Sequence, residues 1–229
     1  MRKMPTIFIR DWENDRSRVT RDPNPDCAWV FAGEGRATRK LDGTCTMLDA
    51  EGHWWGRREV KPGKTAPPNF ALVQVDDRTG KRTGWQPIED TPHAKIHAEA
   101  LNPALYEDGH RFEPGTYELC GPKLNRNPEG FETHVLIPHG AHDLGDVPLD
   151  FDGLAAWLLA RPYEGIVWHH RQDGRHAKLK RKDIPAEFAS SPAMPEAARR
   201  LVGQQYEWKA EHGPEAFDPE QAARVVASE

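Results

Sequence analysis

Short hydrophobic runs separated by turn-forming residues extend through most of this chain, which is the pattern of a sheet-rich domain. We expect strands at residues 7–9, 28–31, 37–40, 44–48, 53–60, 71–75, 116–120 and 134–137. Residues 11–26 and 76–84 are polar and rich in turn-forming residues, so these segments are expected to be loops.

A hairpin is predicted where residues 165–169 and 177–180 flank the turn sequence Gln172-Asp173-Gly174. In the second of these strands Lys178 and Lys180 alternate with Leu179. Because successive side chains of a strand point to opposite faces, both lysines should share one face while Leu179 faces the core.

Helical patterns are fewer. One is expected at residues 93–105, ending near Asn102-Pro103, and another at residues 150–160, with Asp150 or Asp152 as its cap. Beyond residue 184 the composition becomes helical. The sequence therefore predicts an antiparallel α+β domain over residues 1–184 and a helical C-terminal tail over residues 185–229.

Composition adds limits on the class of protein. The chain has 229 residues, a net charge of −5 and three widely spaced cysteines, and no apolar run approaches the roughly 18 residues of a membrane span. We expect a protein of the reducing cytoplasm, without membrane attachment. A basic stripe formed by Arg171, Arg175, Lys178, Lys180, Arg181 and Lys182 is a candidate RNA contact, although a solvated strand edge would have the same composition.

The sequence Lys40-Leu41-Asp42-Gly43-Thr44 is the centre of the predicted chemistry. A lysine becomes a nucleophile when it loses its proton, and burial together with a neighbouring positive charge lowers its pKa. A lysine at a strand end, followed by an Asp-Gly turn, can present its amine to a nucleoside triphosphate. Attack there would form a lysine–nucleotide phosphoramidate and release pyrophosphate.

Such a site also needs carboxylates for a metal or for ribose hydroxyls, and cations for the phosphates. Glu118 and Glu164 each lie in a predicted strand region close to a glycine, where a ligand can approach. Lys178 and Lys180 on one face repel each other, so an anion is their natural partner. Alone, each of these residues has an ordinary structural interpretation. We interpret nine histidines as structural or surface residues: His53, His93, His97, His110, His139, His142, His169, His170 and His176.

In their order, these residues resemble the motifs of the covalent nucleotidyltransferase superfamily, which contains ATP-dependent RNA ligases, DNA ligases and messenger RNA capping enzymes. Lys40-Leu41-Asp42-Gly43-Thr44 resembles the nucleophile motif, Tyr117-Glu118-Leu119 the third, Glu164-Gly165-Ile166-Val167 the fourth and Lys178-Leu179-Lys180 the fifth. The resemblance spans residues 28–182. It implies that Lys40 carries AMP, that Glu118 contacts the ribose or a metal, that Glu164 binds the metal, and that Lys178 and Lys180 hold the α-phosphate.

The resemblance implies three further contacts with the nucleotide. An arginine after the nucleophile should approach the ribose and phosphates, and both Arg57 and Arg58 are candidates. A ring on the strand after the third motif should stack on the base, with His134 as first choice and Phe131 as second. Glu34 is a candidate for the adenine edge or a metal.

The implied fold is an antiparallel-sheet nucleotidyltransferase domain of the ATP-grasp-like ligase kind. Only residues 183–229 follow Lys182, which is too little for an ordinary OB barrel, so a bare domain with a helical tail is expected. This arrangement is closest to small RNA ligases of phage or bacterial type. The tail or a protein partner would take the place of the barrel.

The function predicted from these observations is an ATP-dependent RNA ligase of RNA repair, which uses Mg²⁺ or Mn²⁺ and joins an RNA 5′-phosphate to a 3′-hydroxyl. Two alternatives stay open. One is a DNA ligase or a GTP-using capping-type enzyme, and the other is a nucleotide- or RNA-binding module that performs no turnover.

Overall fold

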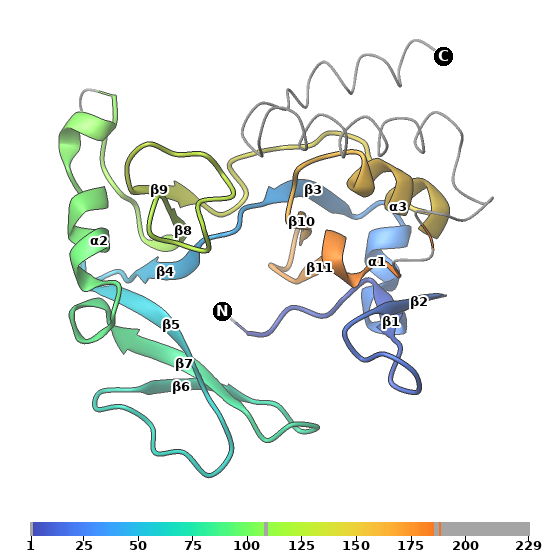
Figure 1. Ribbon diagram of the computed structural model, residues 1–229, viewed down its shortest axis with the longest axis horizontal. Coiled ribbons are helices and arrows are strands. Elements are labelled where there is room, and N and C mark those ends of the chain that lie inside the picture. The colour runs from blue at the N-terminus through green and yellow to red at the C-terminus, as the bar shows by residue number, and fades with distance from the viewer. Residues whose placement is uncertain (1, 108–109, 186–187, 189–229) are drawn as a thin grey trace. The chain divides into compact units, whose positions relative to one another are not determined.

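The computed structural model describes residues 2–107, 110–185 and 188, which form two compact units (Figure 1). Unit 1 contains residues 2–3 and the described part of Leu41–Ala141. Unit 2 contains Met4–Lys40 and the described residues from His142 onward. Each unit has its own sheet and its own hydrophobic core, and we describe each by itself.

Unit 1 is built on an antiparallel sheet of six strands in the order β6-β7-β5-β4-β8-β9 (Figure 1). The strands are β4 (Thr44–Leu48), β5 (Trp54–Val60), β6 (Ala71–Val75), β7 (Arg82–Pro87), β8 (Gly115–Cys120) and β9 (Val135–Pro138). Two 3₁₀ turns, η2 (Ile88–Asp90) and η3 (Pro103–Leu105), flank helix α2 (Ala94–Ala100).

The core of unit 1 lies between one face of this sheet and α2. Leu119 of β8 and Leu136 of β9 are paired neighbours that point to this face, and they cluster with Ile96 and Ala100 of the helix. Since side chains alternate along a strand, the residue before Leu119, Glu118, points to the opposite face. The sheet therefore has an apolar face toward α2 and a second face that carries polar residues.

Unit 2 contains a three-stranded antiparallel sheet in the order β11-β10-β3 and a separate two-stranded hairpin. The sheet consists of β3 (Gly35–Lys40), β10 (Gly165–His170) and β11 (His176–Lys180), and the hairpin of β1 (Phe8–Arg10) and β2 (Val19–Pro23). Helix α1 (Ala28–Phe31), helix α3 (Phe151–Leu159) and the 3₁₀ turns η1 (Pro25–Cys27) and η4 (Arg181–Asp183) complete the unit.

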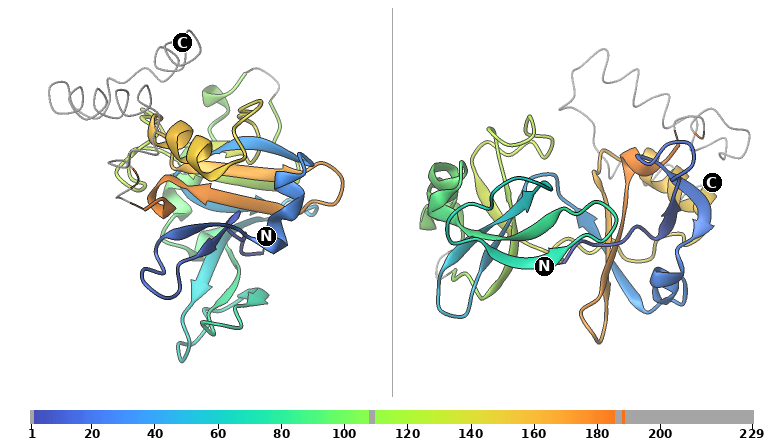
Figure 2. Two further views of the ribbon diagram at one scale, coloured as in Figure 1. Left: turned by 90° about the vertical axis from the view of Figure 1, so that its right-hand side faces the viewer. Right: turned by 90° about the horizontal axis from the view of Figure 1, so that it is seen from below.

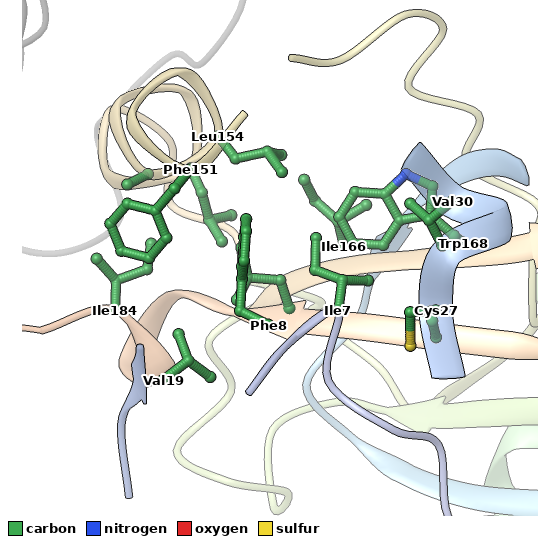
Figure 3. Close-up of a cluster of buried hydrophobic side chains, with 14 of the residues drawn as sticks. Ile7, Phe8, Val19, Cys27, Val30, Phe151, Leu154, Ile166, Trp168 and Ile184 are labelled. Carbon is green, nitrogen blue, oxygen red and sulfur yellow. The ribbon is translucent and has the colours of Figure 1, made fainter. Parts of the chain in front are cut away.

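One face of the three-stranded sheet carries the core of unit 2, and α3 lies over it (Figure 2). Ile166 and Trp168 of β10 pack there with Leu154 of α3 and with Ile7 and Phe8 of the N-terminal segment (Figure 3). The face opposite to this core carries the alternate residues of the same strands, which include Lys40, Lys178 and Lys180.

Most predicted elements are confirmed. The hairpin of residues 165–169 and 177–180 forms as expected, and Leu179 is buried while Lys178 and Lys180 are partly exposed on the other face. Asp150 is the N-cap of α3, where its side chain accepts a hydrogen bond from the Gly153 N–H at 2.8 Å. The α+β class with antiparallel sheets is also confirmed.

Three local predictions are wrong. Residues 28–31 are helix α1, because Asn24 caps a turn that begins with Pro25 and continues directly into these residues. Strand β2 lies within the predicted loop 11–26, where Val19 supplies one buried position and pairs with β1. Strand β7 begins at Arg82, within the second predicted loop.

The helices predicted beyond residue 188 lie outside the described residues, and the domain boundary at residues 184 and 185 stays a prediction. Among the residues that the structure describes, no helix is both long and apolar enough to cross a membrane.

Gly165 offers a test of the packing between β10 and β11. A Cβ at this position would lie 2.3 Å from the Leu179 carbonyl oxygen, whereas a Cβ at Gly115 would come no closer than 3.8 Å to the Glu113 carbonyl oxygen. We expect Gly165→Ala to lower the free energy of unfolding by about 1–3 kcal/mol, because the strands must separate to admit the methyl group. Gly115→Ala, the matched control, should change it by less than about 0.5 kcal/mol. Urea unfolding measures both, and equal effects would contradict this account.

Candidate active site

Three strands bring Lys40 and Lys180 to the same place on the sheet of unit 2. Gly165 of β10 is paired with Lys40 of β3 on one side and with Lys180 of β11 on the other. Residues that face each other in this way point to the same side of a sheet, so both lysines project from the face opposite to the core. Gly165 between them has no side chain, and this allows the backbone of β11 to pack closely on it.

The carboxylate of Glu164 lies between the two lysines. Its Oε2 accepts a hydrogen bond from Lys40 Nζ at 2.5 Å, and its Oε1 accepts one from Lys180 Nζ. The three side chains are largely buried, with exposed fractions of 16% for Lys40, 12% for Glu164 and 20% for Lys180. Burial raises the pKa of Glu164, but the charges and hydrogen bonds of Lys40 and Lys180 outweigh this effect and lower the pKa overall.

Backbone contacts fix the segments that carry these groups. The Arg181 N–H donates to the Glu164 carbonyl at 2.8 Å, and the Lys180 N–H donates to Asp183 Oδ2 at 3.1 Å. Asp183 is itself buried and accepts a hydrogen bond from Arg10 at 2.9 Å. The ends of β10 and β11 are therefore held at the point where Glu164 and Lys180 leave the sheet.

Lys178 lies on the same face of β11 as Lys180, two residues before it. It is opposite Val167, which is opposite Thr38 of β3, and the Thr38 hydroxyl is 2.9 Å from His169 Nε2. The face thus carries three lysines, Lys40, Lys178 and Lys180, and Glu164 bridges two of them. Several lysines on one face are suited to an anion such as a phosphate.

In unit 1, Glu118 projects from the polar face of the six-stranded sheet. Its neighbour on β4 is Cys45, and its own side chain is 8% exposed. Oε1 accepts a hydrogen bond from the Gly43 N–H at 3.0 Å, and Oε2 is 2.8 Å from His139 Nε2. His139 was predicted to be structural or a surface residue, and a sequence pattern gives no sign of this contact.

The same face distinguishes Arg57 from Arg58. Thr46 of β4 pairs with Gly56 of β5, so these two residues point to one face of the sheet. Cys45 and Arg57 each lie one residue away and therefore point to the opposite face. Cys45 pairs with Glu118, so Arg57 and Glu118 lie on the same face. Arg57 Nε is buried and has no hydrogen-bond partner among the described residues. Arg58 is exposed and points to the other face, so the geometry favours Arg57 as an anion ligand.

The Asp42–Gly43 turn, which follows Lys40 in the chain, is held by side chains of unit 1. The Asp42 N–H donates to Glu129 Oε1 at 2.9 Å, and the Asn125 amide donates to Asp42 Oδ1 at 2.8 Å and to the Gly43 carbonyl at 3.0 Å. Asn125 has a φ of 48°, in the left-handed region that non-glycine residues rarely adopt. Such a conformation persists where the surrounding contacts impose it, as they do at this turn.

Comparison with known proteins finds a similarity to RNA ligases. A sequence model of the RNA ligase 1 family matches residues 105–212. The chain is similar to RNA ligase 1. RNA ligase 1 of Pongo abelii is 26% identical, and the match covers 64% of this chain and 66% of that protein. The chain thus spans just under two thirds of the length of this relative, and both findings support an RNA ligase family.

The region that the family model matches, residues 105–212, contains Glu118, Glu164, Lys178 and Lys180, and Lys40 precedes it. Lys40, Glu164 and Lys180 meet in unit 2, whereas Glu118 and Arg57 share a face of unit 1. The roles predicted for these residues stay predictions, and their positions now define two clusters that can be tested separately.

His134 lies on the side of the sheet that packs against α2. Its ring is 5% exposed, and its Nδ1 is 2.9 Å from Glu99 Oε2 of that helix. The ring lines a cavity of about 480 Å³ together with Glu99, Lys123 and Glu132. Ile137, and not His134, is the β9 residue opposite Glu118. Base stacking by His134 stays a prediction, and these contacts do not support it.

The remaining candidates make local contacts within their own units. Glu34 precedes β3, and its Oε2 is 3.1 Å from His170 Nε2. Phe131 exchanges backbone hydrogen bonds with the Asn127 side chain. The predicted basic stripe does not form one surface, because Arg175 contacts the Trp29 ring and Arg181 donates to the Arg161 carbonyl, whereas Lys178 and Lys180 project from the opposite face of the sheet.

The charge balance around Glu164 predicts a pH-dependent contribution to stability. The pKa of Glu164 is lower in the folded state than in the unfolded state, where it is near 4.5. Its ionised form therefore stabilises the folded state at pH values above 4.5, and this stabilisation is lost as the pH falls through the pKa of the folded state. We expect Glu164→Gln to lower the free energy of unfolding by about 1.5–3 kcal/mol at pH 7, because it removes the charge from the two hydrogen bonds that Glu164 accepts from Lys40 and Lys180.

Urea unfolding at a series of pH values measures this difference. It should narrow as the pH falls below 4.5, and the exposed control Glu51→Gln should show almost no difference at any pH. A difference of constant size from pH 7 to pH 3 would contradict the predicted role of the Glu164 charge.

Proposed function

We propose that this protein is an ATP-dependent RNA ligase in which Lys40 forms a covalent intermediate with AMP. The observation that carries the proposal is the meeting of Lys40, Glu164 and Lys180 on one face of the unit 2 sheet. The similarity to RNA ligase 1 supports the class of reaction. The resemblance of the motif order to covalent nucleotidyltransferases supports the mechanism.

In the first step the uncharged Lys40 Nζ attacks the α-phosphorus of ATP. A P–N bond forms, the P–O bond to the β-phosphate breaks, and pyrophosphate leaves. In the absence of ligands Lys40 is paired with Glu164, which favours its charged form. Binding of ATP is proposed to displace Lys40 from Glu164, and the neighbouring positive charge of Lys180 then favours the uncharged amine, whose proton passes to solvent.

Lys180 and Lys178 stabilise the negative charge that develops on the phosphate oxygens during this step. Both project from the same face as Lys40, and neither can accept a proton while charged, so their role is electrostatic. The rate therefore depends on how well the sheet holds these side chains before the nucleotide binds.

A divalent cation, Mg²⁺ or Mn²⁺, fits this site through Glu164. In the described part of the chain, no group of three or more His, Cys, Asp or Glu side chains gathers as a metal site. Mg²⁺ commonly binds one or two carboxylates together with substrate phosphates, and Glu164 is a carboxylate of this kind. When bound, the metal would neutralise phosphate charge and favour the uncharged form of Lys40.

Glu118 and Arg57 are proposed to contact the ribose and phosphates of the nucleotide. Glu118 uses one lone pair on each oxygen for Gly43 and His139, so further lone pairs stay available for ribose hydroxyls. The buried Nε of Arg57 lacks a partner among the described residues, and a bound phosphate would satisfy it.

The last two steps transfer AMP to RNA and seal the strand. A 5′-phosphate oxygen attacks the lysine-bound AMP, the P–N bond breaks, and the RNA leaves Lys40 with an activated end. A 3′-hydroxyl then attacks the 5′-phosphorus, AMP leaves, and a phosphodiester forms as the hydroxyl proton is lost.

Intact-mass spectrometry after incubation with ATP and Mg²⁺ tests the first step. We expect an AMP-sized mass increase in the wild-type protein and none in Lys40→Ala. Lys64→Ala, which changes an exposed lysine, should still form the adduct. An adduct that persists in Lys40→Ala would overturn the assignment of the nucleophile.

Other outcomes separate the alternatives. An adduct formed with GTP and not with ATP would indicate a capping-type enzyme. Sealing of nicked DNA and not of nicked RNA would indicate a DNA ligase. ATP binding without an adduct would indicate a binding module.

Arg57 and Arg58 are adjacent residues on opposite faces, which makes them a matched pair. We expect Arg57→Ala to reduce the rate of adduct formation at low ATP concentration by about 10–100-fold, because a charged hydrogen bond to the nucleotide is lost. Arg58→Ala should reduce it by less than about 2-fold. The dependence of the adduct rate on ATP concentration measures both, and the reverse ranking would contradict the proposed binding face.

A further inference from the structure

Glu118 is held by a continuous chain of hydrogen bonds that begins at Thr116. The Thr116 hydroxyl is 2.9 Å from His139 Nδ1, and His139 Nε2 is 2.8 Å from Glu118 Oε2. The other carboxylate oxygen, Oε1, accepts the Gly43 N–H at 3.0 Å. All four residues belong to unit 1, so the chain lies within one compact body.

The register of the sheet explains why these groups meet. Thr116 and Glu118 are two residues apart on β8 and therefore share a face. Tyr117 between them pairs with Pro138 at the end of β9, so His139 emerges beside Thr116, and its N–H donates to the Thr116 carbonyl at 3.0 Å. The His139 ring is thus fixed at its backbone and at both ring nitrogens.

These contacts also determine which ring nitrogen carries a proton. An ionised carboxylate can only accept hydrogen bonds, so Nε2 must be the donor to Glu118. Nδ1 is then left to accept a hydrogen bond from the Thr116 hydroxyl when the ring is neutral. The arrangement fixes the orientation of a carboxylate that is otherwise attached to the sheet by a flexible side chain.

Gly43 makes this orientation strict. A Cβ at Gly43 would lie 2.2 Å from the Leu119 carbonyl oxygen, so the turn packs directly on β8. Rotation of the Glu118 side chain would leave the Gly43 N–H without its acceptor in this tight contact, at a cost typical of an unsatisfied buried donor. His139 and Gly43 therefore hold the carboxylate from its two ends.

We propose that His139 is a positioning residue that holds Glu118 ready for the ribose hydroxyls of the nucleotide. This rests on the proposed function, in which Glu118 contacts the ribose. His139 acts through Glu118 and need not touch the nucleotide. Its effect should therefore appear as selectivity for the ribose, and as the order of the Gly43 turn, more than as overall stability.

The selectivity test compares adduct formation from ATP with that from 2′-deoxy-ATP and 3′-deoxy-ATP. A hydrogen bond from a hydroxyl to a charged group predicts that the wild-type protein prefers ATP over at least one analogue by about 10-fold or more. We expect His139→Ala and His139→Asn to reduce this preference to about 2-fold or less. His139→Gln should retain most of it, because its amide places a donor near the position of Nε2, whereas the shorter asparagine amide lies near Nδ1.

His53→Ala is the matched control, since the His53 side chain is 70% exposed in the same unit. It should keep the wild-type preference. The positioning role would be overturned if His139→Asn and His139→Gln showed the same preference for ATP over the deoxy analogues. It would also be overturned if His139→Ala kept the wild-type preference.

A second measurement does not depend on adduct formation. Amide hydrogen exchange at Gly43, followed by NMR, should be about 10-fold faster in His139→Asn than in the wild type and within about 3-fold in His139→Gln. If the wild-type protein formed no adduct, the proposed function would fail while this measurement still decided whether His139 holds Glu118. Unchanged exchange at Gly43 in His139→Asn would overturn the inference by itself.

Discussion

The ion pairs of Glu164 with Lys40 and Lys180 are the interaction on which the rest of the account depends. Two buried ammonium groups repel each other, and a single carboxylate between them makes their close approach possible. The sheet supplies the geometry, because Gly165 of the central strand pairs with Lys40 on one side and with Lys180 on the other. A phosphate can replace the carboxylate as the partner of these lysines, and this exchange of anions is the basis of the proposed chemistry.

The turn after Lys40 depends on a different set of carboxylates. Glu118 and Glu129 accept the N–H groups of Gly43 and Asp42, and Asn125 binds the turn from its other side. Hydrogen bonds of backbone donors to ionised acceptors are among the stronger ones in proteins. The residues after Lys40 are therefore held by side chains that lie far away in the sequence, and by the glycine that permits the close contact with Leu119.

Much of the fold follows from local sequence patterns. The alternation of Lys178, Leu179 and Lys180 predicted the two faces of β11, and Asp150 predicted the start of α3. Residues 28–31 misled the interpretation because an apolar run is compatible with either a strand or a helix, and the cap at Asn24 decides between them. Strand β2 was missed because only Val19 is buried in it, so no apolar alternation marks the segment.

For the candidate site, the sequence identified some of the residues that meet in the structure and missed others. Motif order identified Lys40, Glu164 and Lys180, which meet in unit 2, because each lies in or beside a regular strand. Sequence could not choose between Arg57 and Arg58, since only the pairing of β4, β5 and β8 assigns them to faces. His139, Asn125 and Glu129 were missed because their contacts join distant segments through loops and strand ends, where spacing carries no signal.

A crystal structure with a nonhydrolysable ATP analogue that has a methylene group between the α- and β-phosphorus atoms tests the central claim most directly. The account predicts that α-phosphate oxygens lie within hydrogen-bond distance of Lys40 Nζ and Lys180 Nζ, and that the contact between Lys40 and Glu164 is broken. An analogue bound elsewhere, with both lysines still paired to Glu164, would contradict it.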